Sequence, residues 1–220
     1  MSEEDINNKE YDLTICIPAL VERIDKVSEF VKKIEKQIND NDYKDKVQLL
    51  ISLDNRSVPL KDKRNKAQAR STGKYLCHID DDDDITNDFI KEIMDAIQKV
   101  KETELGHVDV ITYDQLARLE DGRDITVKSN IQCHSLELTP LRAEGEETVF
   151  IRYPWQWCCW RTSLVKGVYR DDYDQGPKFE DINWLKKVRL RYPKSQYNID
   201  KVLHIFNGRR LNGMESACGW

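Results

Sequence analysis

The residues best suited to chemistry in this chain are five consecutive aspartates at positions 80–84. They follow the apolar-leaning run Lys74–Ile79, which is rich in strand-forming residues and is preceded by the helix breaker Gly73. A helical pattern comes after them, so the acids are expected at the carboxyl end of a strand, where open α/β sheets place their ligands. Five like charges repel one another unless water or a divalent cation separates them.

A cation explains this cluster better than a helix cap does. Asp84 or Thr86 could cap the following helix, but capping accounts for one or two acids and not for five. A calcium EF-hand loop is excluded because positions 6 and 12, counted from Asp80, are Ile85 and Lys91 instead of Gly and Glu. Hard carboxylate oxygens favour Mg²⁺ or Mn²⁺, which usually bridge to phosphates. The sequence therefore predicts a metal-held diphosphate, of a nucleotide sugar or of another phosphorylated substrate.

Composition limits the classes of protein that this chain can represent. Its 220 residues suffice for one sizeable domain, and the net charge of −5 does not indicate a broad basic surface for nucleic acid. No apolar run approaches the roughly 20 residues of a membrane helix, and the acidic start does not resemble a signal peptide. The six cysteines form no C-x-x-C pair, which favours a reduced, cytoplasmic protein.

The elements that must position the acids are predicted from apolar periodicity. Buried strands alternate with amphipathic helices in the first half, which makes βαβ units and implies a parallel sheet. A basic helix, expected to end at Gly73, leads into the acidic strand. The predicted strands span 13–17, 47–53, 74–79 and 108–113, and the predicted helices span 24–38, 60–72 and 89–100.

The second half, from about residue 114, mixes antiparallel pieces with one clear helix. The pair Asp121-Gly122 predicts a hairpin turn between 115–119 and 124–129, and apolar spacing predicts a helix over 181–192. The predicted organisation is one domain over 1–220. A nucleotide-binding half at about 11–113 precedes an acceptor half at about 114–207.

Several residues of the second half have both a structural and a functional interpretation. Trp155, Trp157 and Trp160 could form a platform for an acceptor sugar or part of the core. Asp181 could cap its helix or act as a general base. His204, in an apolar strand, is either a core histidine or a third metal ligand or phosphate contact. Arg209 either contacts a leaving diphosphate or belongs to a solvated tail.

The ordered set of motifs resembles the GT-A glycosyltransferases, in particular family 2. The resemblance covers nearly the whole chain, and its single-domain form resembles versions carried by bacteria, phages and large DNA viruses. Each motif is weak alone, and the ordered set is fairly specific. The motifs are Leu13-Thr14-Ile15-Cys16-Ile17-Pro18, Asp54, Lys63-Arg64-Asn65-Lys66, Gly73-Lys74-Tyr75 leading to Ile79-Asp80-Asp81-Asp82-Asp83, and Phe179-Glu180-Asp181.

This resemblance implies a Rossmann-like nucleotide-binding half and a metal-dependent sugar transfer. The donor would be a nucleoside diphosphate sugar, with a UDP-sugar favoured, and the cofactor would be Mn²⁺ or Mg²⁺. Asp181, assisted by Glu180, would take the proton of the acceptor hydroxyl in a single inverting displacement. Asp80 and Asp82 would form the DXD pair, with the metal on Asp82 and with Asp80 and His204 as further candidates. The implied donor-binding residues are Pro18, Leu20, Glu22, Asp54, Arg64, Asp80, Asp81, Asp82 and Arg209.

Departures from the family pattern leave several alternatives open. Many relatives have Thr-Tyr-Asn after the first-strand proline, where this chain has Ala19-Leu20-Val21, so the base preference is not fixed. Five acids also allow the DXD register to shift by one. Asp82 and Asp84 fit the D-x-D-x-T motif of haloacid dehalogenase phosphatases, and a third alternative is a non-catalytic sugar-binding module. The acceptor could be a glycan, a protein or, less favoured, a modified DNA base.

Overall fold

One mixed sheet runs through the whole molecule, which is described by a computed structural model over residues 9–141, 149–171 and 180–208. Its ten described strands follow the order β2-β1-β3-β9-β5-β6-β8-β7, and β10 pairs with both β5 and β4. Their bounds are β1 Tyr11–Leu20, β2 Val47–Asp54, β3 Gly73–His78, β4 Asp84–Ile85, β5 Val110–Arg118, β6 Asp124–Ser129, β7 Thr139–Leu141, β8 Val149–Arg152, β9 Cys159–Arg161 and β10 Gln196–Asn207.

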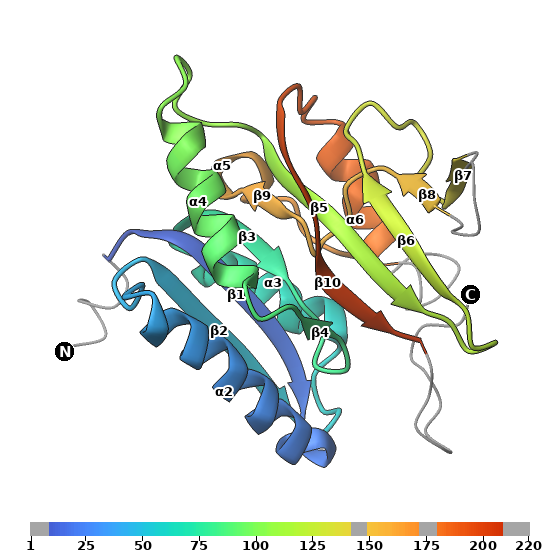
Figure 1. The fold of residues 1–220 in the computed structure, drawn as a ribbon. Helices are drawn as coiled ribbons and strands as arrows, with labels where there is room; N and C mark the ends of the chain where they lie inside the picture. The colour runs from blue at the N-terminus through green and yellow to red at the C-terminus, as the bar shows by residue number, and fades with distance from the viewer. Residues whose placement is uncertain (1–8, 142–148, 172–179, 209–220) are drawn as a thin grey trace.

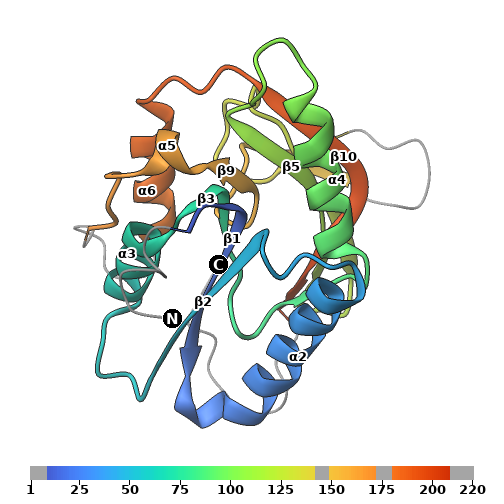
Figure 2. The same ribbon diagram turned by 90° about the vertical axis from the view of Figure 1, so that its left-hand side faces the viewer.

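The helices cover both faces of this sheet. In Figure 2, α2 and α4 lie on one side of the strands, while α3, α5 and α6 lie on the other. Helix α2 buries Val27, Phe30, Ile34 and Ile38, at the three- and four-residue steps that place apolar side chains on one helical face. The bounds are η1 Val21–Arg23, α2 Ile24–Asp40, α3 Leu60–Arg70, α4 Phe89–Lys101, α5 Thr162–Val165 and α6 Glu180–Arg189. None of these helices is both long and apolar enough to cross a bilayer.

The predicted parallel βαβ arrangement is confirmed for the first three strands. β1 lies between β2 and β3 and is parallel to both, with Ile15 opposite Leu49 on one side and Cys77 on the other. Leu13, Ile15 and Ile17 are fully buried, because this central strand has covered faces on both sides. The carboxyl ends of β1, β2 and β3 therefore meet at one edge of the sheet (Figure 1).

The fourth predicted strand is not the next strand of the sheet. β9, from the second half of the chain, lies between β3 and β5 and is antiparallel to both. β5 therefore still runs in the direction of β3, but its neighbour comes from residues 159–161. The predicted boundary near residue 113 falls inside β5, so the two halves of the chain share one continuous sheet.

Gly73 begins β3 and does not end the basic helix, contrary to the prediction. Helix α3 ends at Arg70, and a Cβ atom on Gly73 would lie 2.6 Å from the backbone nitrogen of Thr14. The amide of Gly73 donates to Thr14 Oγ1 at 2.9 Å. The glycine is required because β3 approaches β1 too closely for a side chain.

The predicted hairpin and the last predicted helix are both present. β5 and β6 are antiparallel, and Gly122 in their turn has a φ of +91°, which favours glycine. Helix α6 begins at Glu180, one residue before the predicted start, and ends at Arg189, short of the predicted Tyr192.

Candidate functional site

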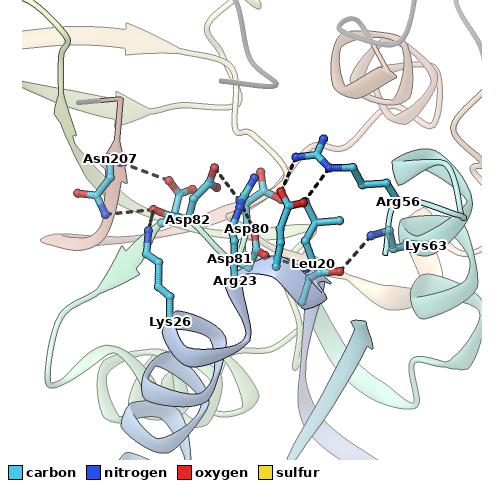
Figure 3. Close-up of polar contacts among 12 residues, drawn as sticks. Leu20, Arg23, Lys26, Arg56, Lys63, Asp80, Asp81, Asp82 and Asn207 are labelled. Atoms are coloured by element: carbon cyan, nitrogen blue, oxygen red, sulfur yellow. Dashed lines mark hydrogen bonds and ion pairs between the residues drawn. The ribbon is translucent and has the colours of Figure 1, made fainter. Parts of the chain in front are cut away.

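The five aspartates form a loop directly after β3, at the edge where the parallel strands end. The amide of Ile79 donates to the carbonyl of Cys16 at 3.0 Å, so the chain stays bonded to β1 up to the residue before the loop. Figure 3 shows the loop meeting Leu20 at the end of β1 and Asn207 at the end of β10. Asn207 Nδ2 donates to the carbonyl of Asp82 at 3.2 Å. The predicted placement at a strand's carboxyl end is confirmed.

Asp81, Asp83 and Asp84 hold the acidic loop in place. Asp81 accepts from the Leu20 amide at 3.0 Å and from Arg23 Nη1 at 2.6 Å. Asp83 Oδ2 lies 3.1 Å from His204 Nε2. Asp84 Oδ1 accepts from Lys33 Nζ at 2.8 Å. These three acids are committed to contacts within the chain.

Asp80, Asp82 and Asp84 are the more exposed members of the run, and each has one basic partner. Their side chains are 25%, 51% and 38% exposed, whereas those of Asp81 and Asp83 are almost completely buried. The alternation places these three on the solvent side of the loop, and Asp84 also accepts from the amide of Ile85. Partial burial and the nearby charge of Asp80 both raise the pKa of Asp82 above its usual value.

Arg64 joins this loop to the carboxylates at the start of α6. Its Nη2 lies 2.6 Å from Asp80 Oδ1, and its Nη1 lies 2.6 Å from Asp181 Oδ1 and also bonds Glu180 Oε1. The arginine is on α3 and its side chain is buried. Arg64 therefore lies among three acids at the carboxyl edge of the sheet.

Two residues outside the predicted site, Gln156 and Arg170, complete the surroundings of Asp181. Gln156 Nε2 donates to Asp181 Oδ2 at 3.1 Å, and Arg170 Nη2 donates to Gln156 Oε1 at 3.0 Å. Arg170 is fully buried against the ring of Trp184, with its guanidinium carbon 4.5 Å from the ring centre. Both oxygens of Asp181 thus face fixed donors, which orient the carboxylate.

Burial shifts the ionisation of the groups around Asp181. The pKa of Glu180 is raised to about 7 because burial outweighs the opposing charge of Arg64. The pKa of Arg170 is lowered to about 10 by burial and by the neighbouring charge of Arg64. Glu180 can therefore hold a proton near neutral pH. The total negative charge of the three carboxyl groups around Arg64 depends on whether that proton is bound.

The predicted donor-site residues of β1 and β2 lie at the same edge of the sheet. Leu20 and Asp54 are paired across the two strands, and Pro18 is paired with Ser52. Asp54 is ion-paired with Lys63 and accepts from the Val58 amide at 2.7 Å, so it shapes the loop after β2. Glu22 forms an ion pair with Arg56 on the surface. Arg209 lies outside the described residues.

The structure favours the core interpretation for two of the three tryptophans. Trp160 is fully buried, and its indole N–H donates to the carbonyl of Trp155 at 3.1 Å. Trp157 is also buried and stacks on His204 with ring centres 5.3 Å apart. Trp155 is partly buried, and the guanidinium of Arg152 lies 3.4 Å from its ring centre. Trp157 and Trp160 therefore belong to the core, and Arg152 lies over the ring of Trp155.

His204 is buried in the core, which fits the first of the two interpretations that the sequence leaves open. Its Nδ1 lies 2.8 Å from Gln115 Nε2 and its Nε2 faces Asp83, so both ring nitrogens point at protein groups. Among the described residues, no three His, Cys, Asp or Glu side chains are grouped closely enough to hold a metal. A cation at this edge would therefore depend on Asp80 and Asp82, with phosphate and water oxygens completing its coordination.

The central, mostly parallel sheet, with helices on both faces and acids at its carboxyl edge, defines a Rossmann-like α/β fold of the GT-A type. Solved structures of S. aureus TarS residues 1–349 share this fold. The TM-score is 0.53 for TarS alone at 16% identity, 0.55 for TarS in complex with UDP at 15% identity, and 0.56 for TarS in complex with UDP-GlcNAc at 14% identity.

These matches cover 89%, 88% and 92% of this chain, respectively, and 60% of each TarS chain. The chain therefore spans about 60% of the length of these neighbours. At this level of identity the similarity is one of fold. No family model and no curated protein sequence matches the chain.

Proposed function

We propose that this chain is a glycosyltransferase that moves a sugar from a nucleoside diphosphate sugar to an acceptor hydroxyl. One observation carries the proposal. Asp80, at the end of a parallel strand, lies beside Asp181 because both carboxylates pair with Arg64, and Asp82 follows Asp80 in the same loop. The acids come from segments about a hundred residues apart, and they meet at the edge where α/β folds bind their ligands. The shared fold with TarS, which was solved in complex with UDP-GlcNAc, supports a nucleotide-sugar donor.

Asp181 is the proposed general base. Gln156 and Arg64 each bond one of its oxygens from the protein interior, and its side chain remains 20% exposed. A carboxylate accepts about four hydrogen bonds, so lone pairs remain for an acceptor hydroxyl on the open side. Asp181 would take the proton of that hydroxyl as the oxygen attacks the anomeric carbon, and direct displacement inverts the configuration there.

Asp80 and Asp82 are the proposed ligands of Mg²⁺ or Mn²⁺. Carboxylate oxygens suit these hard cations, which are commonly bound by one or two carboxylates together with substrate phosphates. Burial and the like charge of Asp80 raise the pKa of Asp82, and a bound cation would relieve the repulsion between the two carboxylates. The cation would neutralise charge on the departing diphosphate.

The donor and acceptor are proposed only by chemical class. A UDP-sugar is the first candidate because TarS was solved in complex with UDP and with UDP-GlcNAc. Pro18, Leu20 and Asp54 lie at the edge of the sheet beside the acidic loop and are the proposed surroundings of the nucleotide. A glycan hydroxyl is the favoured acceptor, and the proposed setting is the cytoplasm.

The phosphatase alternative gains no support from the geometry. It requires Asp82 and Asp84 to face the same phosphate group. Asp84 instead turns to Lys33 and to the amide of Ile85, at 2.8 Å in each case. Its carboxylate therefore serves the loop and the neighbouring helix.

The proposal is tested by measuring ligand binding and turnover together. Nucleotide sugars with Mn²⁺ are screened for an increase in melting temperature, since a ligand that binds only the folded chain stabilises it. Donor hydrolysis and transfer to simple glycosides are then followed by nucleotide release. Stabilisation by a UDP-sugar with Mn²⁺-dependent release of UDP supports the proposal. Binding without release favours the non-catalytic module, and hydrolysis of plain phosphate esters without nucleotide binding contradicts it.

A further inference from the structure

Arg23, at the end of η1, occupies the position of a cation within the acidic loop. Its Nη1 lies 2.6 Å from Asp81 Oδ1 and 3.1 Å from Asp82 Oδ2, so one nitrogen bridges two successive aspartates. Figure 3 shows this side chain pointing into the loop. The sequence motifs gave Arg23 no role.

The two contacts of Arg23 differ in how firmly they are held. The side chain of Asp81 is only 6% exposed, and its other oxygen accepts from the Leu20 amide at 3.0 Å. Asp82 is 51% exposed, and no other side-chain partner of its carboxylate is recorded within the described residues. Arg23 is therefore anchored by Asp81, while its contact with Asp82 is open to competition from solvent.

Lys26 approaches the same loop in a different way. Its Nζ donates to the backbone carbonyl of Asp82 at 3.0 Å, and its side chain is exposed at the start of α2 (Figure 3). Lys26 thus brings a positive charge close to Asp82 without contacting its carboxylate. Comparing Arg23 with Lys26 therefore separates direct competition for the Asp82 carboxylate from the effect of a nearby charge.

We propose that Arg23 is a built-in counter-ion that gives up Asp82 to a divalent cation and then binds the donor's diphosphate. This inference rests on the proposed function. A guanidinium fork matches phosphate oxygens, and Asp81 would keep it at the edge of the cation site after Asp82 is released. Arg23 is then a phosphate-positioning residue that also keeps the acidic loop folded before the ligands arrive.

The proposal predicts opposite effects of Arg23 on two ligands. Its charge competes with a cation for Asp82, so removing the charge strengthens binding of Mn²⁺ alone. The same charge attracts a diphosphate, so removing it weakens binding of UDP in the absence of metal. A merely structural role would weaken both, because the loop would lose its order.

The test compares Arg23→Gln with Lys26→Gln, which removes the same charge. Each variant is titrated calorimetrically with Mn²⁺ alone and with UDP in the presence of a chelator, and its melting temperature is recorded. Arg23→Gln is expected to bind Mn²⁺ about threefold to tenfold more tightly and UDP about tenfold more weakly than the unchanged chain. Lys26→Gln is expected to change each affinity by less than about twofold.

Each alternative result has a distinct meaning. If Arg23→Gln weakens both ligands, or if the two variants behave alike, the inference is overturned. If Arg23→Gln does not fold, Arg23→Lys replaces it; this variant keeps the charge without the planar fork, and unchanged UDP affinity in it would also overturn the inference. An unchanged chain that binds neither Mn²⁺ nor UDP contradicts the proposed function itself.

Discussion

Arg64 Nη1 lies 2.6 Å from Asp181 Oδ1, which links helix α3 of the first half to the start of α6 in the second. The guanidinium is buried and also reaches Asp80 and Glu180. A buried charge is stable only when it is paired, so this arginine holds the geometry of the site together.

Arg64→Ala is expected to destabilise the fold by about 3–5 kcal/mol, because it leaves buried carboxylates without their counter-ion. Urea unfolding measures this change. The exposed Lys66, on the same helix, is the control, and Lys66→Ala is expected to stay within about 0.5 kcal/mol of the unchanged chain. Equal stability of the two variants would show that Arg64 is not required to balance the acids.

Asp181→Asn is expected to lower the transfer rate by about 10²–10⁴-fold, because the amide cannot accept the acceptor's proton. Donor affinity should be unchanged, since the amide retains the shape of the group. Initial rates and calorimetry with UDP measure the two effects separately. Asp171→Asn, at an exposed acid paired with Lys187, is the control and should transfer normally. Full turnover by Asp181→Asn would remove this residue from the mechanism.

Asp82→Asn is expected to abolish most of the gain in UDP affinity that Mn²⁺ provides, because a carboxylate ligand of the cation is lost. Calorimetry with and without Mn²⁺ measures this gain. Asp84→Asn, whose carboxylate faces Lys33, should keep it. If Asp84→Asn loses the gain and Asp82→Asn keeps it, the metal-binding pair is in another register of the run.

Glu180 should make stability depend on pH. Its pKa is about 7 in the folded chain against an ordinary value of 4.5, so the folded state binds its proton more tightly than the unfolded state does. Its contribution to the free energy of unfolding is therefore largest below pH 4.5 and falls as the pH rises to about 7.

Glu180→Gln should remove this contribution and flatten the profile over that range. Urea unfolding at several pH values measures the slope. The surface acid variant Glu104→Gln is the control and should retain the slope of the unchanged chain. Identical slopes in Glu180→Gln and in the control would contradict the assignment.

Gly73→Ala is expected to lower stability by about 1–3 kcal/mol, because the new Cβ would lie 2.6 Å from Thr14 N and Oγ1. Thermal unfolding measures the loss. Lys74→Ala, at the exposed neighbouring position, is the control and should change little. An unchanged melting temperature for Gly73→Ala would mean that β3 can move away from β1 without cost.

The sequence was a reliable guide where structure depends on local periodicity. Helix α2 and strand β1 carry their apolar spacing in consecutive residues, and the acids follow β3 at the predicted place. Contacts between distant segments left no such signal. The insertion of β9 between β3 and β5 depends on pairing across most of the chain.

The candidate site shows the same division. Asp80 and Asp181 were selected from motifs, but Gln156 and Arg170 became visible only through their contacts with Asp181. The tryptophan cluster was ambiguous because aromatic residues serve cores and sugar sites alike, and burial decides between the two. Trp160 proved to be fully buried.

The position of β9 has a consequence for synthesis of the chain. β3 and β5 each pair with β9, so they lack this neighbour until Cys159–Arg161 emerges from the ribosome. The βαβ units of the first half are synthesised earlier, and the edge of β3 stays unpaired during this time. We expect a nascent chain truncated before β9 to recruit chaperones that shield open strand edges, and to release them once β9 is translated.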